Sequence, residues 1–434
     1  MLTIFTERNS PRIEYVLRTL FDGIFRIPFE IIDDPSFLPG RNNPCLVYAQ
    51  KPYHDKPFIR SGNLLFEEGV AKTKVDPGKW NDLPVLFSHK DERSLFPFDP
   101  LAMIFYLISC YEEYFKDAGR DMHGRIAEPE TAPVRYGLHD RPVVNIIAQA
   151  LIEKIKATCP EFEYRQEEYR FTPTYDIDMA FAHLGKGFVR MAAGYGKLLL
   201  KLNFREVFNR TATLAGRRSD PYDNFELQMD LHNELGLHPL YFVNLGDFGK
   251  YDKNVSWTNI RLHSLLKKLS LHADIGMHPS YHANEKPELY AIEKDRLEKI
   301  LGRSVTKSRQ HFLRLDFPET YRKLLDIGID SDYSMGYAGQ PGFRAGICTP
   351  FRFYDLLEEK ETRLMVYPFA FMDASFLDYL KIDAEETKMM LHPLIRDVKH
   401  VQGHLMGIWH NYALADDPER LKNYREIIEM SLAE

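Results

Sequence analysis

Cysteine is scarce in this sequence, with four residues scattered over 434 positions. No two of them are spaced as C-x-x-C, so neither a zinc ribbon nor a disulfide framework is indicated. If the protein uses a metal ion, the ligands must therefore be histidine, aspartate or glutamate. The chain offers 16 histidines and 63 acidic residues for that purpose.

Long apolar runs are lacking as well. The longest near-continuous run, residues 101–111, is far shorter than the roughly 20 residues that cross a bilayer. The first residues contain no basic segment followed by an apolar one, so no secretory signal is indicated and we expect a cytoplasmic protein. The net charge of −7 gives no reason to expect nucleic acid as a partner. A hydrophobic content of 44% is enough to build a substantial core, which excludes a disordered chain.

The length predicts two domains rather than one. Residues 1–165 mix short strand-like stretches with helices and predict a smaller α/β domain without evident chemistry. The expected helices are 11–25, a helix that begins at Pro100 and runs towards Gly119, and 144–157. The polar segment 120–125 (RDMHGR) is expected to be a surface turn.

Residues 166–434 alternate strand-like and helix-like runs, which predicts parallel strands in a doubly wound sheet or a β/α barrel. In both architectures the chemistry lies at the carboxyl ends of the strands. The expected strands are 171–175, 240–243, 273–277, 310–313, 365–369 and 404–409, and the clearest helices are 225–235, 287–301, 318–327 and 383–398.

Two pairs of polar residues follow predicted strands. Asp176 and Asp178 end one strand and point the same way, because side chains alternate along a strand. His278 and His282 follow another strand and, four residues apart, can converge on one ion. Taken singly, the aspartates are better explained as solvated side chains of a loop, and the histidines are equally explained as unrelated surface side chains. Together they suit a catalytic metal site, with Asp178, His278 and His282 as ligands and Asp176 as the base.

Residues 170–415 resemble the polysaccharide deacetylase domain (NodB-like, carbohydrate esterase family 4), which is a distorted β/α barrel. The D-x-D aspartates and the His-x-x-x-His pair match its first two motifs. The resemblance implies that Arg309 orients the base, with His311 and Arg314 as weaker candidates at the same strand end. It also matches Asp332 to the acidic residue of the fourth motif.

The fifth motif of the family is a histidine that protonates the leaving group, and His410 in GIWHN matches it. The implied cofactor is a divalent metal ion, zinc first and cobalt or nickel as alternatives. The sequence departs from the family pattern at Tyr175 and Pro279 and lacks the proline of the third motif. These departures concern loop shape and substrate preference more than the metal site.

A basic helical insertion near 184–225 separates the two ligand motifs. Residues 184–218 contain eight basic residues and one acid, interleaved with apolar ones. Such a segment suits contact with an anionic membrane surface or a phosphate-bearing substrate, or it forms a helical cover with a solvated basic face. The sequence indicates no oligomeric state.

The function that this sequence favours is a metal-dependent hydrolase that removes N-acetyl or O-acetyl groups from a carbohydrate or sugar precursor. Two alternatives stay open. One is hydrolysis of a non-carbohydrate amide on the same barrel, and the other is a carbohydrate-binding or partner-binding module with a vestigial site.

Overall fold

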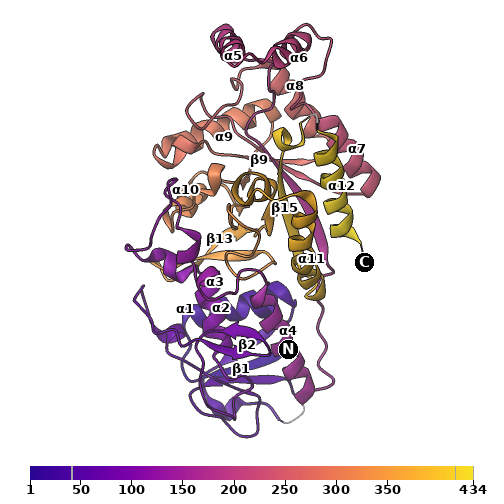
Figure 1. Ribbon diagram of the computed structural model, residues 1–434. Helices are drawn as coiled ribbons and strands as arrows, with labels where there is room; N and C mark the ends of the chain where they lie inside the picture. Colours follow the sequence, from indigo (N-terminus) through magenta and orange to yellow (C-terminus); the bar gives the residue numbers. More distant parts are fainter. Residues whose placement is uncertain (41–42, 416, 434) are drawn as a thin grey trace.

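The computed structural model describes residues 1–40, 43–415 and 417–433. Residues 1–165 build a parallel sheet of order β2-β1-β3-β4 beside the small antiparallel pair β5–β6. Its helices α1, α2 and α4 lie on the side of this sheet that faces the rest of the chain (Figure 1). The elements are β1 (Leu2–Thr6), α1 (Pro11–Leu17), β2 (Phe29–Ile32), β3 (Cys45–Ala49), β4 (Phe58–Arg60), β5 (Gly78–Trp80), β6 (Leu83–Val85), α2 (Pro100–Ile108), α3 (Ala132–Arg135) and α4 (Val143–Thr158).

The helix starts of this region follow their capping residues. Ser10 caps α1, which continues as a wider helix to Ile24, so the helix predicted over 11–25 is confirmed. Asp99 caps α2, with proline at the first helical position. The expectation that α2 runs towards Gly119 is wrong: it ends at Ile108, because Cys110 adopts a left-handed conformation with φ 49°.

The remainder of the chain forms one nine-stranded sheet of order β12-β13-β11-β10-β9-β8-β7-β15-β14. All its neighbouring strands are parallel except β12 and β13. Its strands are β7 (Arg170–Ile177), β8 (Leu240–Val243), β9 (Asp274–Met277), β10 (Lys307–Ser308), β11 (Ser331–Asp332), β12 (Phe351–Asp355), β13 (Lys360–Val366), β14 (Phe371–Met372) and β15 (His404–His410). The strand predicted over 310–313 is a short 3-10 turn that follows β10.

The predicted barrel is not closed within the described residues. The sheet has two free ends, β12 and β14, and no ladder of hydrogen bonds joins them. The irregular segment 333–350 lies in the gap and is tied to the strand ends by single backbone bonds, such as Phe369 N to the Met335 carbonyl at 3.0 Å. The observed class is therefore a mixed α/β fold with several sheets.

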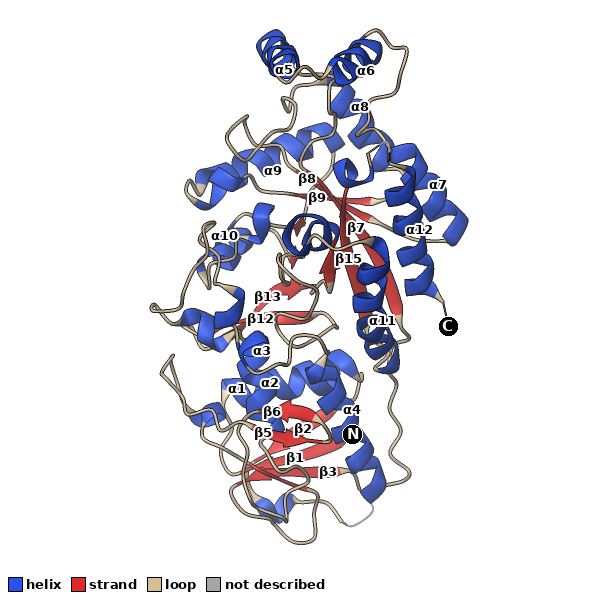
Figure 2. Cartoon of the chain, in the orientation of Figure 1, coloured by secondary structure: helices blue, strands red, loops and turns tan. Residues whose placement is uncertain are grey.

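Helices cover this sheet on both sides (Figure 2). α9 and α10 lie on its left in this view, and α7, α11 and α12 on its right. Asp383 and Glu386 form the predicted capping box of α11. The helices are α5 (Phe188–Leu200), α6 (Phe204–Leu214), α7 (Phe225–Leu235), α8 (Ile260–Leu269), α9 (Glu288–Leu301), α10 (Glu319–Asp326), α11 (Ala384–His400) and α12 (Pro418–Leu432). Among the described residues, no helix is both long enough and apolar enough to cross a membrane.

The two sheets share one continuous apolar core, which runs from Leu2 to Ile428. Two of the ion pairs that join residues 1–165 to the rest of the chain contain a buried arginine. Arg344 donates from Nε to Glu113 at 2.9 Å, with both side chains almost fully buried. Arg12, also buried, bonds to Glu359 near β13. Residues 1–165 are therefore packed against the larger sheet through buried charged pairs as well as apolar contacts.

Candidate active site

The expected base lies at the carboxyl end of β7, an inner strand of the larger sheet. Asp176 is 3% exposed, and its Oδ1 accepts a hydrogen bond of 2.8 Å from Nη1 of Arg309. Arg309 is fully buried and also donates to Thr174 Oγ1 and to the carbonyl of Tyr333, each at 2.9 Å. Since a guanidinium has its donors in a fixed plane, these bonds set the orientation of the carboxylate. The structure thus brings Arg309 and Asp176 together, as the motif resemblance implies.

Three potential ligands meet beside Asp176, each from the end of a different strand. The Nε2 atoms of His278 and His311 lie 3.2 Å and 3.5 Å from Oδ1 of Asp178. One ligand atom from each of the three side chains lies within 4.8 Å of the others. Asp178 follows β7, His278 follows β9, and His311 lies in the turn after β10. This is a potential metal-binding triad with a donor set typical of zinc.

The hydrogen bonds of the two imidazoles test whether a metal ion fits. Nδ1 of His278 lies 2.6 Å from the carbonyl oxygen of Arg309, and Nδ1 of His311 lies 2.9 Å from Oδ1 of Asp252. A neutral imidazole that donates from Nδ1 has a lone pair on Nε2, so both rings turn an acceptor towards Asp178. Oδ1 of Asp178 is buried and has no hydrogen-bond donor in the described chain. When both rings are neutral, acceptors face one another here, and a cation between them balances the arrangement, so this donor set fits a divalent ion.

The charges around the triad lead to the same conclusion. Four carboxylates converge there, those of Asp176, Asp178, Asp252 and Asp373, against one buried guanidinium. Burial works to lower the pKa of His311, but Asp178 and Asp252 raise it to about 9. Burial works to raise the pKa of Asp178, but the facing imidazoles hold it well below its usual range. The site therefore attracts positive charge, whether as protons or as a metal ion.

His410, the expected proton donor, lies on the other side of Asp178. It ends β15 beside Asp176 in the strand register, and its Nε2 is 3.8 Å from Oδ2 of Asp178. Asp373 holds it twice, through Nδ1 at 2.6 Å and through the backbone N–H at 2.7 Å. Burial works to lower the pKa of His410, but Asp373 and the site aspartates raise it to about 10. The ring is thus protonated near neutral pH, with Nδ1 committed to Asp373.

A cavity of about 320 Å³ contains these groups. Its reactive lining is Asp176, Asp178, His278, His311 and His410, and Leu313, Met372 and Tyr412 are among the other lining residues.

One wall of the cavity comes from the first 165 residues. Arg125 lines it, donates from Nε to Asp121 at 2.7 Å and donates from Nη1 to the carbonyl of Phe312 at 3.0 Å. The ring of His123 packs 4.7 Å from that of Phe312. Segment 120–125 is a surface turn, as expected, and Met122 is 85% exposed, but His123 and Arg125 contact Phe312 at the cavity. The N-terminal region, which was predicted to lack chemistry of its own, therefore helps to shape the site.

His282 does not join the triad, contrary to the expected ligand set. Its side chain is 44% exposed and lies 3.4 Å from Glu285. Residues 281–284 form a 3-10 turn after an extended Ser280, so the i, i+4 spacing of an α-helix does not apply. Buried Glu293 fixes this path by accepting hydrogen bonds from the backbone N–H and hydroxyl of Ser280. His311 occupies the place expected for His282.

Asp332 also lies apart from the reactive groups. It is fully buried on β11, and its carboxylate accepts two hydrogen bonds of 2.9 Å, from the backbone N–H and the hydroxyl of Ser334. Burial raises the pKa of Asp332 to about 6, although the two hydrogen bonds from Ser334 act to lower it. It does not line the cavity. The carboxylate that reaches His410 is Asp373 instead, so the expected role of Asp332 in the site is not met by the geometry.

Two residues of the site have roles that were not predicted from the sequence. Asp373 ends the apolar run 367–372, much as Asp176 ends its strand, and its role is to hold His410. Asp252 has no such signal, because it lies in the long connection after β8. It is nevertheless held by Asn244 and by the backbone N–H of Tyr281, and it orients His311.

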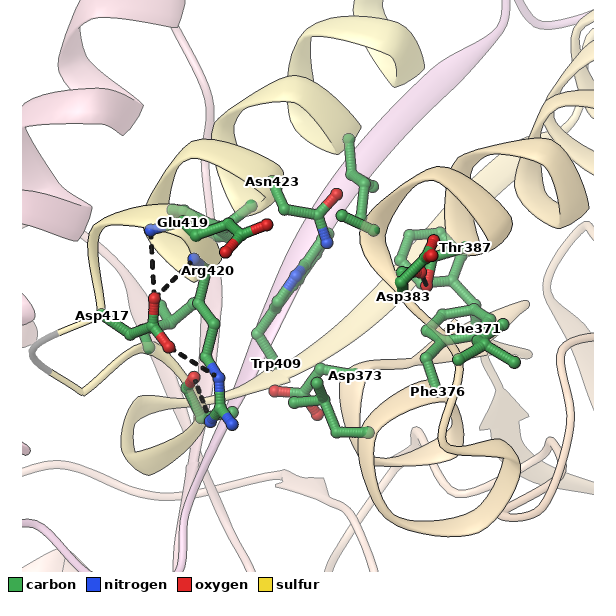
Figure 3. A pocket seen from close by; sticks show the side chains of 17 residues that line it. Phe371, Asp373, Phe376, Asp383, Thr387, Trp409, Asp417, Glu419, Arg420 and Asn423 are labelled. Atoms are coloured by element: carbon green, nitrogen blue, oxygen red, sulfur yellow. Dashed lines mark hydrogen bonds and ion pairs between the residues drawn. The ribbon is translucent and has the colours of Figure 1, made fainter.

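A second cavity, of about 230 Å³, opens between α11 and α12 (Figure 3). Trp409 and Phe371 are among its apolar lining residues, and Asp417 and Arg420 form an ion pair at its edge. Asp373 lines this cavity too, while its carboxylate holds His410. The second cavity thus borders the site through one shared residue and contains no group of potential metal ligands of its own among the described residues.

A family model matches the N-terminal part of the chain. Residues 2–160 match DUF7033, a family of unknown function. No curated protein matches the sequence. The matched segment covers the N-terminal region that supplies Arg125 to the cavity.

Solved structures resemble this chain at low identity. One is a protein from Mycobacterium smegmatis assigned as a polysaccharide deacetylase, with 13% identity, a TM-score of 0.40, and coverage of 62% of this chain and 86% of that one. Another is a polysaccharide deacetylase from Bacillus cereus, with 13% identity, a TM-score of 0.26, and coverage of 60% and 89%. A 4-alpha-glucanotransferase from Thermococcus litoralis has 14% identity, a TM-score of 0.34, and coverage of 62% and 37%.

Proposed function

We propose that this protein is a metal-dependent hydrolase that removes acetyl groups from an N-acetylated or O-acetylated carbohydrate. The main support for the proposal is that two groups able to transfer a proton lie beside the potential metal-binding triad, each fixed in position by a neighbouring side chain. Asp176 is fixed by Arg309, His410 is fixed by Asp373, and both line the cavity that contains the triad. The carbohydrate substrate is suggested by the motif resemblance of residues 170–415.

The residues that would hold the ion are Asp178, His278 and His311. A divalent ion held there supplies a Lewis acid and lowers the pKa of bound water from 15.7 towards about 7. Asp252 holds Nδ1 of His311, and the carbonyl of Arg309 holds Nδ1 of His278. These contacts turn Nε2 of both imidazoles towards Asp178.

The proton transfers fall to the chain's own groups. Arg309 occupies Oδ1 of Asp176, which leaves Oδ2 to accept a proton from the attacking water. The raised pKa of His410 keeps Nε2 protonated and ready to donate to the departing amine or alcohol. Because Asp373 occupies Nδ1, the proton can leave only from the cavity side.

Acetate release from chitooligosaccharides by the zinc-loaded protein tests this proposal. We expect turnover by the wild type, and a loss of roughly a hundredfold or more in Asp176→Asn with the metal still bound, because proton transfer by a positioned group contributes about 10²–10⁴-fold. His410→Gln is expected to behave likewise. A series of small cyclic amides in the same assay distinguishes the carbohydrate substrate from another amide. Metal-loaded protein that hydrolyses none of these compounds would contradict the proposal.

A further inference from the structure

Helices α5 and α6 form a hairpin that projects from one end of the molecule, away from both sheets (Figures 1 and 2). Its inner face is held by a hydrogen bond of 2.9 Å between the hydroxyls of Tyr195 and Thr211 and by Arg210, whose guanidinium lies 5.1 Å from the Tyr195 ring. Arg190 ties the base of the hairpin to the carbonyls of residues 253 and 254. The hairpin therefore has a defined orientation on the body of the protein.

The outer face of α5 is apolar. The helix contains no buried residue, and of its eight exposed positions only Lys197 is polar. A surface helix normally turns its apolar side to the core and its polar side to water, and here that order is reversed. Val189 is 80% exposed and Leu200 is 88% exposed. The other exposed positions of α5 are Phe188, Ala192, Ala193, Gly196 and Leu199.

The same character continues into α6. Exposed Leu202 follows Lys201 between the helices. Exposed Phe204 opens α6 and is followed by Arg205, so apolar and basic side chains alternate. Phe208 lies one helical turn after Phe204 and is 74% exposed. A contiguous exposed apolar surface of this kind marks an interaction site.

The charge of the hairpin identifies the kind of partner. Residues 184–218 contain eight basic residues and one acid, in a chain whose net charge is −7. Lys197, Lys201, Arg205 and Arg217 are exposed and make no ion pair with any described residue. A second copy of the chain would set these basic groups against each other, whereas an anionic surface neutralises them.

We propose that the α5–α6 hairpin docks on an anionic lipid bilayer. Its exposed leucines and phenylalanines enter the boundary between headgroups and acyl chains, while the lysines and arginines contact the lipid phosphates. Long basic side chains can reach the phosphates while their aliphatic stems lie in the apolar layer. This inference is independent of the proposed reaction, because no cavity residue takes part in it.

Vesicle sedimentation with the full-length protein tests the inference. We expect binding to vesicles of phosphatidylcholine with phosphatidylserine, weak binding to phosphatidylcholine alone, and release as the ionic strength is raised. The charge variant Lys197→Gln, Lys201→Gln, Arg205→Gln is expected to bind roughly a hundredfold more weakly, at about fivefold for each basic residue removed.

The apolar contribution is tested by Leu200→Ser, Leu202→Ser, Phe204→Ser, which is expected to abolish binding while the far-UV circular dichroism stays unchanged, since all three side chains are exposed. The matched control replaces Leu271 and Leu357 with serine, two exposed leucines outside the hairpin, and is expected to bind as the wild type does. Acetate release in solution is expected to be unchanged in all three variants.

Three results would overturn the inference. The first is no sedimentation with phosphatidylserine vesicles. The second is equal loss of binding in the control and in the apolar variant. The third is a dimer in light scattering that the apolar variant abolishes, since a second copy would then cover the face.

Discussion

His311, rather than His282, is predicted to hold the metal ion, and replacing each in turn by alanine separates the two. His311→Ala removes an imidazole whose Nε2 lies 3.5 Å from Asp178, whereas His282→Ala removes a half-exposed ring that lies beside Glu285 and outside the triad. Zinc binding to four-ligand peptide sites is worth about 10–16 kcal/mol, or roughly 3 kcal/mol for each ligand. We therefore expect His311→Ala to weaken zinc binding roughly a hundredfold.

The assay is competition for zinc against a chromophoric chelator at fixed pH, with circular dichroism to check that each variant folds. His282→Ala is expected to bind zinc within about twofold of the wild type, because an exposed contact contributes little. Asp252→Asn keeps all three ligands but weakens the hold on His311, so an intermediate loss of about 10–100-fold is expected. Equal losses in His282→Ala and His311→Ala, or a loss in His282→Ala alone, would refute the assignment.

Three further predictions concern other parts of the chain. Burial, followed by the charge of the neighbouring Glu113, raises the pKa of the Glu112 carboxyl to about 7. The folded state therefore binds a proton at Glu112 more tightly than the unfolded state does. As a result, the folded state loses stability as the pH rises from about 4.5 to 7. Urea unfolding is expected to show the wild type losing about 3 kcal/mol over this range relative to Glu112→Gln, and parallel pH profiles would contradict this. Glu113→Gln is expected to lower the free energy of unfolding by about 3–5 kcal/mol, because it leaves Arg344 buried without its partner. The double variant Glu113→Gln, Arg344→Met is expected to lose less than the sum of the two single changes. Arg125→Ala is expected to raise KM for the oligosaccharide while zinc affinity stays unchanged, because Arg125 lines the cavity without contacting the triad; an unchanged KM would exclude a role in binding.

The strand–helix alternation and the residues at strand ends could be read from the sequence because both depend on local chemistry. Asp176, His278 and His410 each follow an apolar run directly, and parallel strands bring such positions to one edge of the sheet. The spacing of His278 and His282 misled because a helical turn, or a loop of similar reach, would bring the two rings together. Ser280 and the buried Glu293 impose an extended path instead. That constraint comes from a contact between distant residues and has no local signature.

The same reason accounts for the partners that were not foreseen. Asp252 contacts His311 from 59 positions away, and it lies in a loop whose sequence shows no periodic pattern. Arg125 lines the cavity from the N-terminal region. The open sheet could not be predicted from the sequence either. Whether the two edge strands pair depends on the path of segment 333–350 between them.

The buried ion pair of Glu113 and Arg344 limits how the two parts of this protein can be recombined during evolution. A gene rearrangement that joined the larger sheet to an unrelated N-terminal partner would leave Arg344 without a counter-charge. Such a chimaera would begin about 3–5 kcal/mol less stable, a large part of the 5–15 kcal/mol that holds a typical domain together. The two halves are therefore expected to occur together across genomes, in the same order, and substitutions at positions 113 and 344 to arise as pairs.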